Sequence, residues 1–249
     1  MPDFARYPSL TDRPVLVTGG ATGIGAEIVA QFRAQGSRVA FLDIDAAAGA
    51  AHAAATGAHF IACDLRDIAA LRRAIADATD KVGAPLALVN NAARDDRHPI
   101  DSVEPAYFDE RIAVNLRHQF FAAQAVIPGM EHAGTGSIVN LGSVSWLAAS
   151  GGMPAYLSAK AAVRGLTRAL ARDLGPRGIR VNEVVPGWVK TARQDALWIT
   201  PEAAARSLAA QCIPQWLAPA DIARMVLFLA ADDSRMITAQ SFLVDAGRV

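Results

Sequence analysis

The sequence is poor in cysteine, carries no excess charge of either sign and contains no long apolar run. Its two cysteines, Cys63 and Cys212, are too few for a disulfide framework, and neither lies in a Cys-x-x-Cys motif. Two packing thiols in a reducing compartment are therefore expected. The 24 basic and 24 acidic residues cancel, and no basic block marks a site for nucleic acid or for an anionic membrane.

Segments that would direct the chain to or through a membrane are also missing. Residues 1–14 have neither the basic start nor the apolar core of a secretory signal, and no apolar run is long enough to span a bilayer. No group of His, Cys and carboxylate residues has the spacing of metal ligands. We therefore expect a cytoplasmic protein without a metal and with no nucleic acid or membrane partner.

Length and composition favour one large α/β domain. The chain has 249 residues, of which 52% are hydrophobic and 19% charged. This is enough for one substantial core and short for two. No linker or internal repeat divides the sequence, so residues 1–249 are expected to form a single domain.

The first 43 residues contain a pattern typical of dinucleotide binding. An apolar run at residues 14–17 leads into TGGATGIG at residues 18–25, which is followed by a helical pattern and by a second strand pattern at residues 38–42. The second strand pattern ends in Asp43, about 20 residues beyond the glycines, as in strand–turn–helix–strand units that bind dinucleotides.

Three glycines of this turn have separate expected functions, and the acid selects the cofactor. Gly19 permits a tight turn, Gly23 lets the backbone approach a pyrophosphate, and Gly25 lets helix and strand pack closely. A carboxylate at Asp43 accepts hydrogen bonds from the adenosine ribose and repels a 2′-phosphate, which favours NAD over NADP. Asp43 could also open the turn into the next helix.

The alternation of strand and helix patterns continues to the end of the chain. Further strands are expected at residues 59–62, 85–89, 137–141, 179–185 and 241–244, with helices at residues 67–82, 105–131, 153–174 and 221–230. Residues 191–215 are irregular for this alternation, with a short helix after Pro201. The pattern predicts a Rossmann-type, doubly wound parallel sheet of about seven strands with helices on both faces.

Three groups that could act on one hydroxyl lie within residues 141–160. They are Ser143, Tyr156 and Lys160, and the last two stand at i and i+4 of an expected helix, on one face. An ammonium there would lower the pKa of the phenol, which needs a shift of roughly 2 to 3 units to act near neutral pH. A buried Lys160 together with a cationic nicotinamide nearby could supply this shift. By itself this spacing leaves an ordinary amphipathic pair equally open.

Taken together, the motifs resemble those of the short-chain dehydrogenase/reductase family over nearly the whole chain. They occur in the family's order: TGGATGIG, NNAA at residues 90–93, Asn115, Ser143, YLSAK at residues 156–160 and PGWVKT at residues 186–191. Two positions depart from the family pattern, Ala93 in place of glycine and Gly142 in place of a frequent serine.

The resemblance implies an NAD-dependent oxidoreductase and a catalytic set of Asn115, Ser143, Tyr156 and Lys160. Tyr156 would act as the base while hydride passes to the nicotinamide, Lys160 would keep Tyr156 ionised, Ser143 would bind the reacting oxygen, and Asn115 would link Lys160 to solvent through water. The resemblance also implies a homotetramer. The cofactor residues that it implies are Gly19, Thr22, Gly23, Ile24, Gly25, Asp43, Asp64, Leu65, Asn91, Ala92, Tyr156, Lys160, Pro186, Gly187, Val189 and Thr191.

A closer resemblance is to bacterial NAD-dependent sugar 1-dehydrogenases, D-xylose dehydrogenases in particular. It rests on RDDRH at residues 94–98, DERIAVNLRH at residues 109–118, SVSW at residues 143–146 and PGWVKTARQ at residues 186–194. It implies oxidation of an aldose at C1 to its lactone, the aldose being a pentose such as D-xylose or L-arabinose, or a deoxyhexose. The substrate residues expected are Ser143, Trp146, Tyr156 and Gln194, with His98, Met153, Trp188, Arg193 and Trp198 as further candidates.

Two alternatives stay open at this stage. One is an NAD(P)-dependent enzyme of the same family that acts on another carbonyl or alcohol, such as a keto-deoxy sugar acid, a 3-oxoacyl thioester or a steroid. The other is a scaffold that senses NAD without catalysis, which the complete catalytic set disfavours.

Overall fold

Seven parallel strands form one sheet in the computed structural model of the chain, which describes residues 4–249. The sheet has the order β3-β2-β1-β4-β5-β6-β7. The predicted parallel sheet of about seven strands is therefore confirmed. The strands are β1 Pro14–Thr18, β2 Arg38–Asp43, β3 His59–Ala62, β4 Ala87–Asn90, β5 Gly136–Leu141, β6 Ile179–Pro186 and β7 Ser241–Val244.

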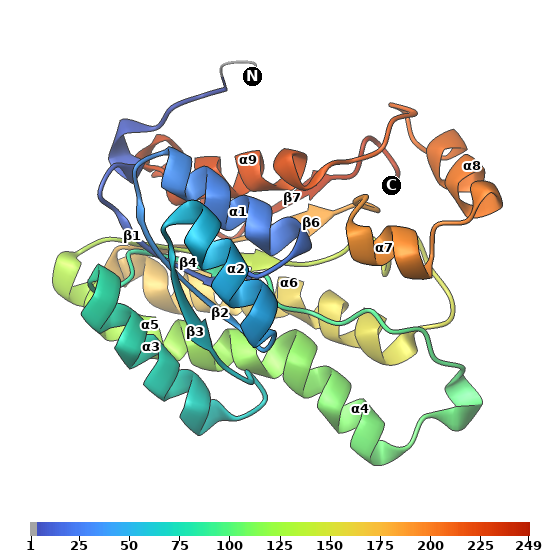
Figure 1. The fold of residues 1–249 in the computed structure, drawn as a ribbon, viewed down its shortest axis with the longest axis horizontal. Coiled ribbons are helices and arrows are strands. Elements are labelled where there is room, and N and C mark those ends of the chain that lie inside the picture. The colour runs from blue at the N-terminus through green and yellow to red at the C-terminus, as the bar shows by residue number, and fades with distance from the viewer. Residues whose placement is uncertain (1–3) are drawn as a thin grey trace.

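Helices cover both faces of the sheet, as Figure 1 shows. One face carries α1 (Gly23–Ala34), α2 (Ala46–Thr56) and α9 (Pro219–Ala230), and the other carries α3 (Ile68–Val82), α5 (His118–Ala133) and α6 (Pro154–Leu174). Beyond these layers lie α4 (Pro105–Ile112), α7 (Ala192–Leu197) and α8 (Pro201–Ala209). Single turns occur at η1 Pro8–Leu10, η2 Ile100–Ser102, η3 Ala113–Arg117, η4 Gly175–Arg177 and η5 Asp232–Ser234.

The core consists of two apolar layers, one on each side of the sheet. Every residue of β1, β4 and β5 is buried, as expected for central parallel strands that are covered on both faces. Phe32 and Phe41 are packed in the layer under α1 and α9, whereas Leu16 and Leu42 are packed in the layer under α3 and α5. Within residues 4–249, none of the helices combines the length and the apolar character that crossing a bilayer requires.

The structure differs from the expected element pattern in two places. The helix expected over residues 105–131 is interrupted by a π-helical turn, η3, around Asn115. Residues 191–215, expected to hold one short helix, contain α7 and α8 instead. Threonine side chains start both helices, because Thr191 Oγ1 accepts from the N–H of Gln194 at 3.3 Å and Thr200 Oγ1 accepts from the N–H of Ala203 at 3.2 Å.

The fold brings the loops after four strands to one edge of the sheet. The strand order reverses between β1 and β4, and ligands of such sheets bind beyond the carboxyl ends of the strands at this reversal. The glycine turn follows β1, the NNAA stretch begins at the end of β4, and the loops with Ser143 and Gly187 follow β5 and β6.

Candidate active site

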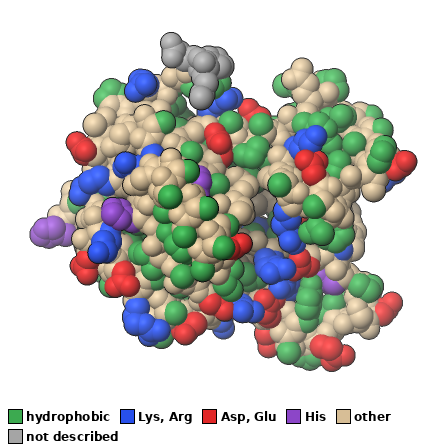
Figure 2. All heavy atoms as spheres, in the orientation of Figure 1, with side chains coloured by type: hydrophobic (Ala, Val, Ile, Leu, Met, Phe, Trp, Pro, Cys, Tyr) green, Lys and Arg blue, Asp and Glu red, His purple; other side chains and the backbone are tan. Residues whose placement is uncertain are grey.

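A cavity of about 930 Å³ lies over the carboxyl ends of the central strands, within the size range of cofactor and ligand sites. Figure 2 shows the molecule hollowed between the body over the sheet and the segment that contains α7 and α8, with basic and acidic side chains along the hollow. All residues expected at the cofactor line the cavity: Gly19, Thr22, Gly23, Ile24, Gly25, Asp43, Asp64, Leu65, Asn91, Ala92, Tyr156, Lys160, Pro186, Gly187, Val189 and Thr191.

The first turn of α1 offers free backbone donors to this cavity. Thr22, the N-cap residue, makes no side-chain hydrogen bond to the helix, whereas Asp45 and Asp67 cap α2 and α3 with their carboxylates. The N–H groups at the start of α1 are therefore left for an external acceptor, and the helix dipole favours an anion there. Gly23 has a φ of +58°, a backbone conformation that disfavours a side chain.

The glycine turn is held tightly by Asn91. The Nδ2 atom of Asn91 donates to the carbonyl oxygens of Thr18 at 3.1 Å and Gly19 at 2.8 Å. A Cβ atom on Gly25 would come within 1.9 Å of the Gly19 carbonyl oxygen and 2.5 Å of Asn91 Nδ2. Gly25 thus lets the turn pack against the start of α1 and against the loop after β4, rather than against a strand as expected.

Asp43 organises the turns on both sides of it in its position at the end of β2. Its Oδ2 accepts from the N–H of Ala21 at 2.9 Å, and its Oδ1 accepts from the N–H of Asp45 at 3.0 Å. These bonds fix the carboxylate at the cavity wall, where it can still accept from ribose hydroxyls. The carboxylate therefore organises the turn and lies at the wall of the cavity.

Asp64, Leu65 and Cys63 form the part of the cavity after β3. The guanidinium of Arg66 donates to the Asp64 carboxylate at 2.7 Å and holds the pKa of Asp64 below its usual range. Burial raises the pKa of the Cys63 thiol to about 11, so this thiol stays protonated at neutral pH. Cys63 therefore acts as a small packing residue.

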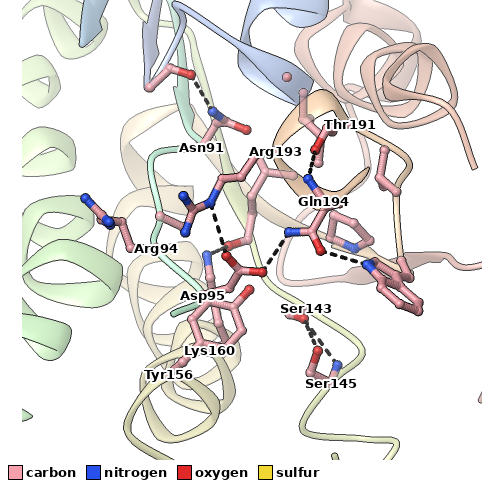
Figure 3. Close-up of a pocket in the computed structure, with 18 of the residues that line it drawn as sticks. Asn91, Arg94, Asp95, Ser143, Ser145, Tyr156, Lys160, Thr191, Arg193 and Gln194 are labelled. Carbon is pink, nitrogen blue, oxygen red and sulfur yellow. Dashed lines mark hydrogen bonds and ion pairs between the residues drawn. The ribbon is translucent and has the colours of Figure 1, made fainter. Parts of the chain in front are cut away.

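Tyr156, Lys160 and Ser143 converge on the opposite part of the cavity, as Figure 3 shows. Tyr156 and Lys160 lie on one face of α6, and Lys160 Nζ is 5.9 Å from the centroid of the Tyr156 ring. Lys160 is 1% exposed, and its Nζ donates to the carbonyl oxygen of Leu141 at 2.7 Å. The hydroxyl groups of Ser143 and Ser145 are hydrogen-bonded at 3.0 Å.

The protein alone does not lower the pKa of Tyr156, a shift that was expected from Lys160 together with a bound nicotinamide. Burial raises the pKa of Tyr156 to about 12, and the hydrogen bond from Ser143 opposes this only in part. Burial also lowers the pKa of Lys160 to about 8, against the charges of Glu183 and Asp95. Burial has this effect on both groups because it disfavours the charged form of each.

Asn115 lies beside the cavity but does not line it. Its Oδ1 accepts from the N–H of Arg94 at 2.9 Å, and its Nδ2 donates to the carbonyl oxygens of Arg94 at 3.2 Å and Arg111 at 2.9 Å. The carbonyl oxygen of Asn115 itself accepts from Nε2 of Gln119 at 3.1 Å. The side chain of Asn115 thus fixes the loop after β4 to the π-helical turn.

A polar network connects side chains that line the cavity. Gln194 donates from Nε2 to Asp95 Oδ2 at 2.8 Å and accepts from Trp188 Nε1 at 2.8 Å. Arg193 forms ion pairs with Asp95 at 3.6 Å and with Asp96 at 2.6 Å. These contacts join α7 to the loop after β4 above Tyr156 (Figure 3), and the Asp95 charge raises the pKa of Tyr156.

Only some of the other residues expected near the substrate line the cavity. Trp188, Arg193, Gln194 and Met153 line the cavity, whereas Trp146, Trp198 and His98 do not. Trp146, expected to face a sugar, is partly buried outside the cavity wall. His98 is 6% exposed rather than solvated, because it bonds the Tyr107 hydroxyl at 3.0 Å and the N–H of Ala155 at 3.2 Å.

Residue-by-residue reasoning missed Asp95, Arg97 and Ser145, all of which line the cavity. Their signal was present in the RDDRH and SVSW stretches, where two consecutive acids follow a buried strand and a second serine follows Ser143. Among residues 4–249, no three His, Cys, Asp or Glu side chains gather as a metal site would require.

Comparisons with known proteins agree on one family. A family model described as "Enoyl-(Acyl carrier protein) reductase" matches residues 19–248. A Rhizobium meliloti protein named "Probable galactose dehydrogenase GalD" is 48% identical over 249 residues, covering 98% of this chain and 97% of that protein. A Caulobacter vibrioides D-xylose 1-dehydrogenase is 46% identical over 248 residues, covering 98% of each chain. A solved short-chain type dehydrogenase/reductase from Mycobacterium ulcerans superposes with a TM-score of 0.92 at 25% identity, covering 96% of this chain and 90% of that one.

Proposed function

Because the chain belongs to the short-chain dehydrogenase/reductase family, and is thus an oxidoreductase with a nicotinamide dinucleotide cofactor, we propose that it oxidises an aldose at C1 to the lactone with NAD. The observation that carries this proposal is the convergence of Tyr156, Lys160 and Ser143 beside a polar network around Asp95, in the cavity that holds the cofactor residues. The substrate is expected to be D-xylose, L-arabinose or a related aldose.

The cofactor residues suit a dinucleotide that lacks the 2′-phosphate on its adenosine ribose. The uncapped start of α1 and the glycines leave room and donors for a pyrophosphate. The Asp43 carboxylate at the cavity wall suits free ribose hydroxyls and would repel a 2′-phosphate. We infer NAD as the cofactor from these two features.

Each proposed catalytic side chain has a defined part in the oxidation. Tyr156 takes the proton of the sugar hydroxyl at its phenolate oxygen, and Ser143 donates a hydrogen bond to the same substrate oxygen. Lys160 supplies the positive charge that offsets the phenolate, and it holds the nicotinamide ribose. Bound NAD supplies the hydride acceptor and a further positive charge, which favours the phenolate that burial disfavours in the protein alone.

The substrate end of the cavity suits a molecule with several hydroxyl groups. Asp95, Gln194, Ser145 and Arg97 present acceptors and donors there, close to Tyr156. A sugar offers several hydroxyl groups to these partly exposed side chains, whereas a steroid or an acyl chain offers few hydrogen-bonding groups. The named sugar substrates of the two relatives support the same class.

Assembly into a homotetramer in the cytoplasm is part of the proposal. Exposed apolar side chains on α4 and α5, Phe108 at 42% and Phe120 at 44%, would be covered by a partner. Ala162 on α6 is exposed and could allow close helix approach, whereas Ala159 is buried within the chain and is not available. Light scattering measures the mass directly, and a monomeric mass would contradict this part.

A substrate screen with both cofactors tests the proposed function. Initial rates are measured with aldopentoses, aldohexoses, sugar acids, a 3-hydroxyacyl thioester and a hydroxysteroid, each with NAD and with NADP. We expect the highest kcat/KM for an aldose with NAD. Turnover of the thioester or steroid in preference to every sugar would contradict the proposal.

A further inference from the structure

A carboxyl group lies buried behind the proposed catalytic side chains. Glu183, on β6, is 0% exposed. Its Oε2 atom accepts a hydrogen bond of 2.5 Å from the Oγ of Ser241 on β7, whereas its Oε1 atom is buried without a hydrogen-bond partner. A buried carboxyl group with an unused acceptor is costly, so its presence calls for a reason beyond packing.

The Oε1 atom of Glu183 lies over the backbone of Gly142. In the register of β5 and β6, Asn140 pairs with Glu183, which brings the glutamate beside the residues that follow β5. A Cβ atom on Gly142 would come within 2.1 Å of Oε1. The serine that the family often has at this position cannot fit while the carboxyl group stays in place. The position of the Glu183 carboxyl group therefore requires a residue without a side chain at Gly142.

The same strand end holds the ammonium of Lys160. Leu141, whose carbonyl oxygen accepts the hydrogen bond from Lys160, directly precedes Gly142, and Ser143 directly follows it. Lys160 and Glu183 are both buried. Burial raises the pKa of Glu183 and lowers that of Lys160, and the charge of each one opposes this shift by favouring the ionised form of the other. Opposite charges interact more strongly in such an enclosed setting than in water.

Three further groups face this pair from neighbouring elements. Asp95, from the loop after β4, also favours the charged form of Lys160, and Arg164, exposed one turn along α6, favours the charged form of Glu183. Burial lowers the pKa of His118, on α5, to about 3, so this imidazole is neutral at working pH. Asp95 is partly exposed in the cavity where substrate would bind, which leaves Glu183 as the fully buried countercharge.

We propose that Glu183 is a positioning residue that holds Lys160 as an ammonium against the Leu141 carbonyl oxygen, and that Gly142 leaves room for its carboxylate. The inference rests on the proposed function only for its consequence in catalysis. The position of Glu183 and Lys160 at the same strand end belongs to the protein without ligands.

Loss of the Glu183 charge has a defined consequence. The pKa of Lys160, already lowered by burial to about 8, falls further when the negative charge is removed, since the carboxylate favours the ammonium. A neutral Lys160 no longer offsets the phenolate of Tyr156. The ascending limb of the plot of kcat/KM against pH for oxidation then moves to higher pH, because Tyr156 must lose its proton without a positive charge on Lys160.

The sequence allows Lys160 to be observed directly. The chain contains three lysines, at positions 81, 160 and 190, so protein with ¹³C-labelled lysine gives few signals, which Lys81→Arg and Lys190→Arg assign. An NMR titration without cofactor measures the pKa of Lys160 in wild type and in Glu183→Gln, which keeps the side-chain shape. We expect a fall of at least about one pH unit in the variant.

Two control variants separate charge from packing. Ser241→Ala removes the hydrogen bond to Oε2 but keeps the carboxylate, and Glu183→Asp keeps the charge on a shorter side chain. We expect the pKa of Lys160 in Ser241→Ala to match wild type and that in Glu183→Asp to lie between wild type and Glu183→Gln. An unchanged pKa in Glu183→Gln, or an equal fall in Ser241→Ala, overturns the proposal.

A double-mutant cycle tests the link between Gly142 and Glu183. Gly142→Ala is expected to lower the Tm in wild type, where the new Cβ meets Oε1, and to lower it less in the Glu183→Ala background. Gly165→Ala on α6, with nothing within 4 Å of its Cβ position, serves as a control that raises or preserves the Tm. An equal loss from Gly142→Ala in both backgrounds contradicts the link.

The two proposals fail in different ways. If no sugar is oxidised but Glu183→Gln still lowers the pKa of Lys160, the proposed function fails and the charge pair stands. If sugars are oxidised and the pKa of Lys160 is the same in both proteins, only the part assigned to Glu183 fails.

Discussion

The ammonium of Lys160 is hydrogen-bonded to the backbone carbonyl oxygen of Leu141 at 2.7 Å. This bond ties the middle of α6 to the carboxyl end of β5, where Ser143 follows two residues later. Tyr156 lies one turn earlier on the same face of α6. Tyr156, Lys160 and Ser143 are thus fixed by a helix and a strand end rather than by a loop alone.

Replacement of Tyr156 by phenylalanine tests the base. The phenol oxygen is the proposed proton acceptor, and general base catalysis contributes about 100- to 10,000-fold, so we expect kcat/KM for the sugar to fall at least about 100-fold. Binding of NAD, measured by quenching of intrinsic fluorescence, should change little. A kcat within tenfold of wild type would show that another group removes the proton.

Asp43 is predicted to determine the choice between NAD and NADP. Its carboxylate lies at the cavity wall, fixed by the N–H groups of Ala21 and Asp45. In Asp43→Ser we expect the ratio of kcat/KM for NAD over NADP to fall about 10- to 100-fold, since a hydrogen bond to a charged group is worth about 1.5 to 3 kcal/mol. Asp45→Asn, at the exposed N-cap of α2, is the matched control, and an equal fall in both variants would contradict the prediction.

Asp95 is predicted to bind the sugar rather than the cofactor. It lies at the substrate end of the cavity, held by Gln194 and Arg193. We expect Asp95→Asn to raise KM for the sugar about tenfold, the equivalent of about 1.4 kcal/mol, while KM for NAD stays constant. Asp101→Asn, on the exposed η2 turn, should leave both constants unchanged. A rise in KM for NAD alone would assign Asp95 to the cofactor.

His118 is predicted to make the fold sensitive to acid. Burial lowers its pKa in the folded protein to about 3 from 6.5, so between these values the unfolded chain binds one more proton. The contribution of neutral His118 to the free energy of unfolding is therefore complete above pH 6.5. It is lost as the pH falls toward 3, by up to roughly 4 kcal/mol.

Urea unfolding at several pH values measures this loss. His118→Leu removes the titrating group, so its free energy of unfolding should fall less steeply below pH 6.5. The exposed His132, at the end of α5, provides the control His132→Asn, which should keep the wild-type slope. Identical slopes in wild type and His118→Leu would contradict the assignment.

The fold and the cofactor end of the cavity follow from patterns that are local in sequence. The glycine turn, the helix after it and Asp43 lie within 30 residues, and β2, β4 and β6 end at Asp43, Asn90 and Pro186, residue types that mark turns. Parallel strands carry all these ends to one edge of the sheet. Local composition therefore suffices to place them.

The substrate end depends on contacts between distant residues, which local patterns do not encode. Gln194 meets Asp95 across 99 positions, and Glu183 meets Gly142 only through the register of β5 and β6. Trp146 follows Ser143 closely, yet the turn after β5 carries its ring out of the cavity wall. The raised pKa of Tyr156 likewise reflects burial by the whole fold.

Hydride transfer from a sugar deuterated at C1 tests the central claim most directly. Wild-type protein is incubated with NAD and the C1-deuterated aldose that gives the highest rate, and the reduced cofactor and the product are analysed by mass spectrometry. We predict one deuterium in each reduced NAD and a product that is the lactone without deuterium. Reduced NAD free of deuterium, or no reduction of NAD by any aldose, would contradict the account.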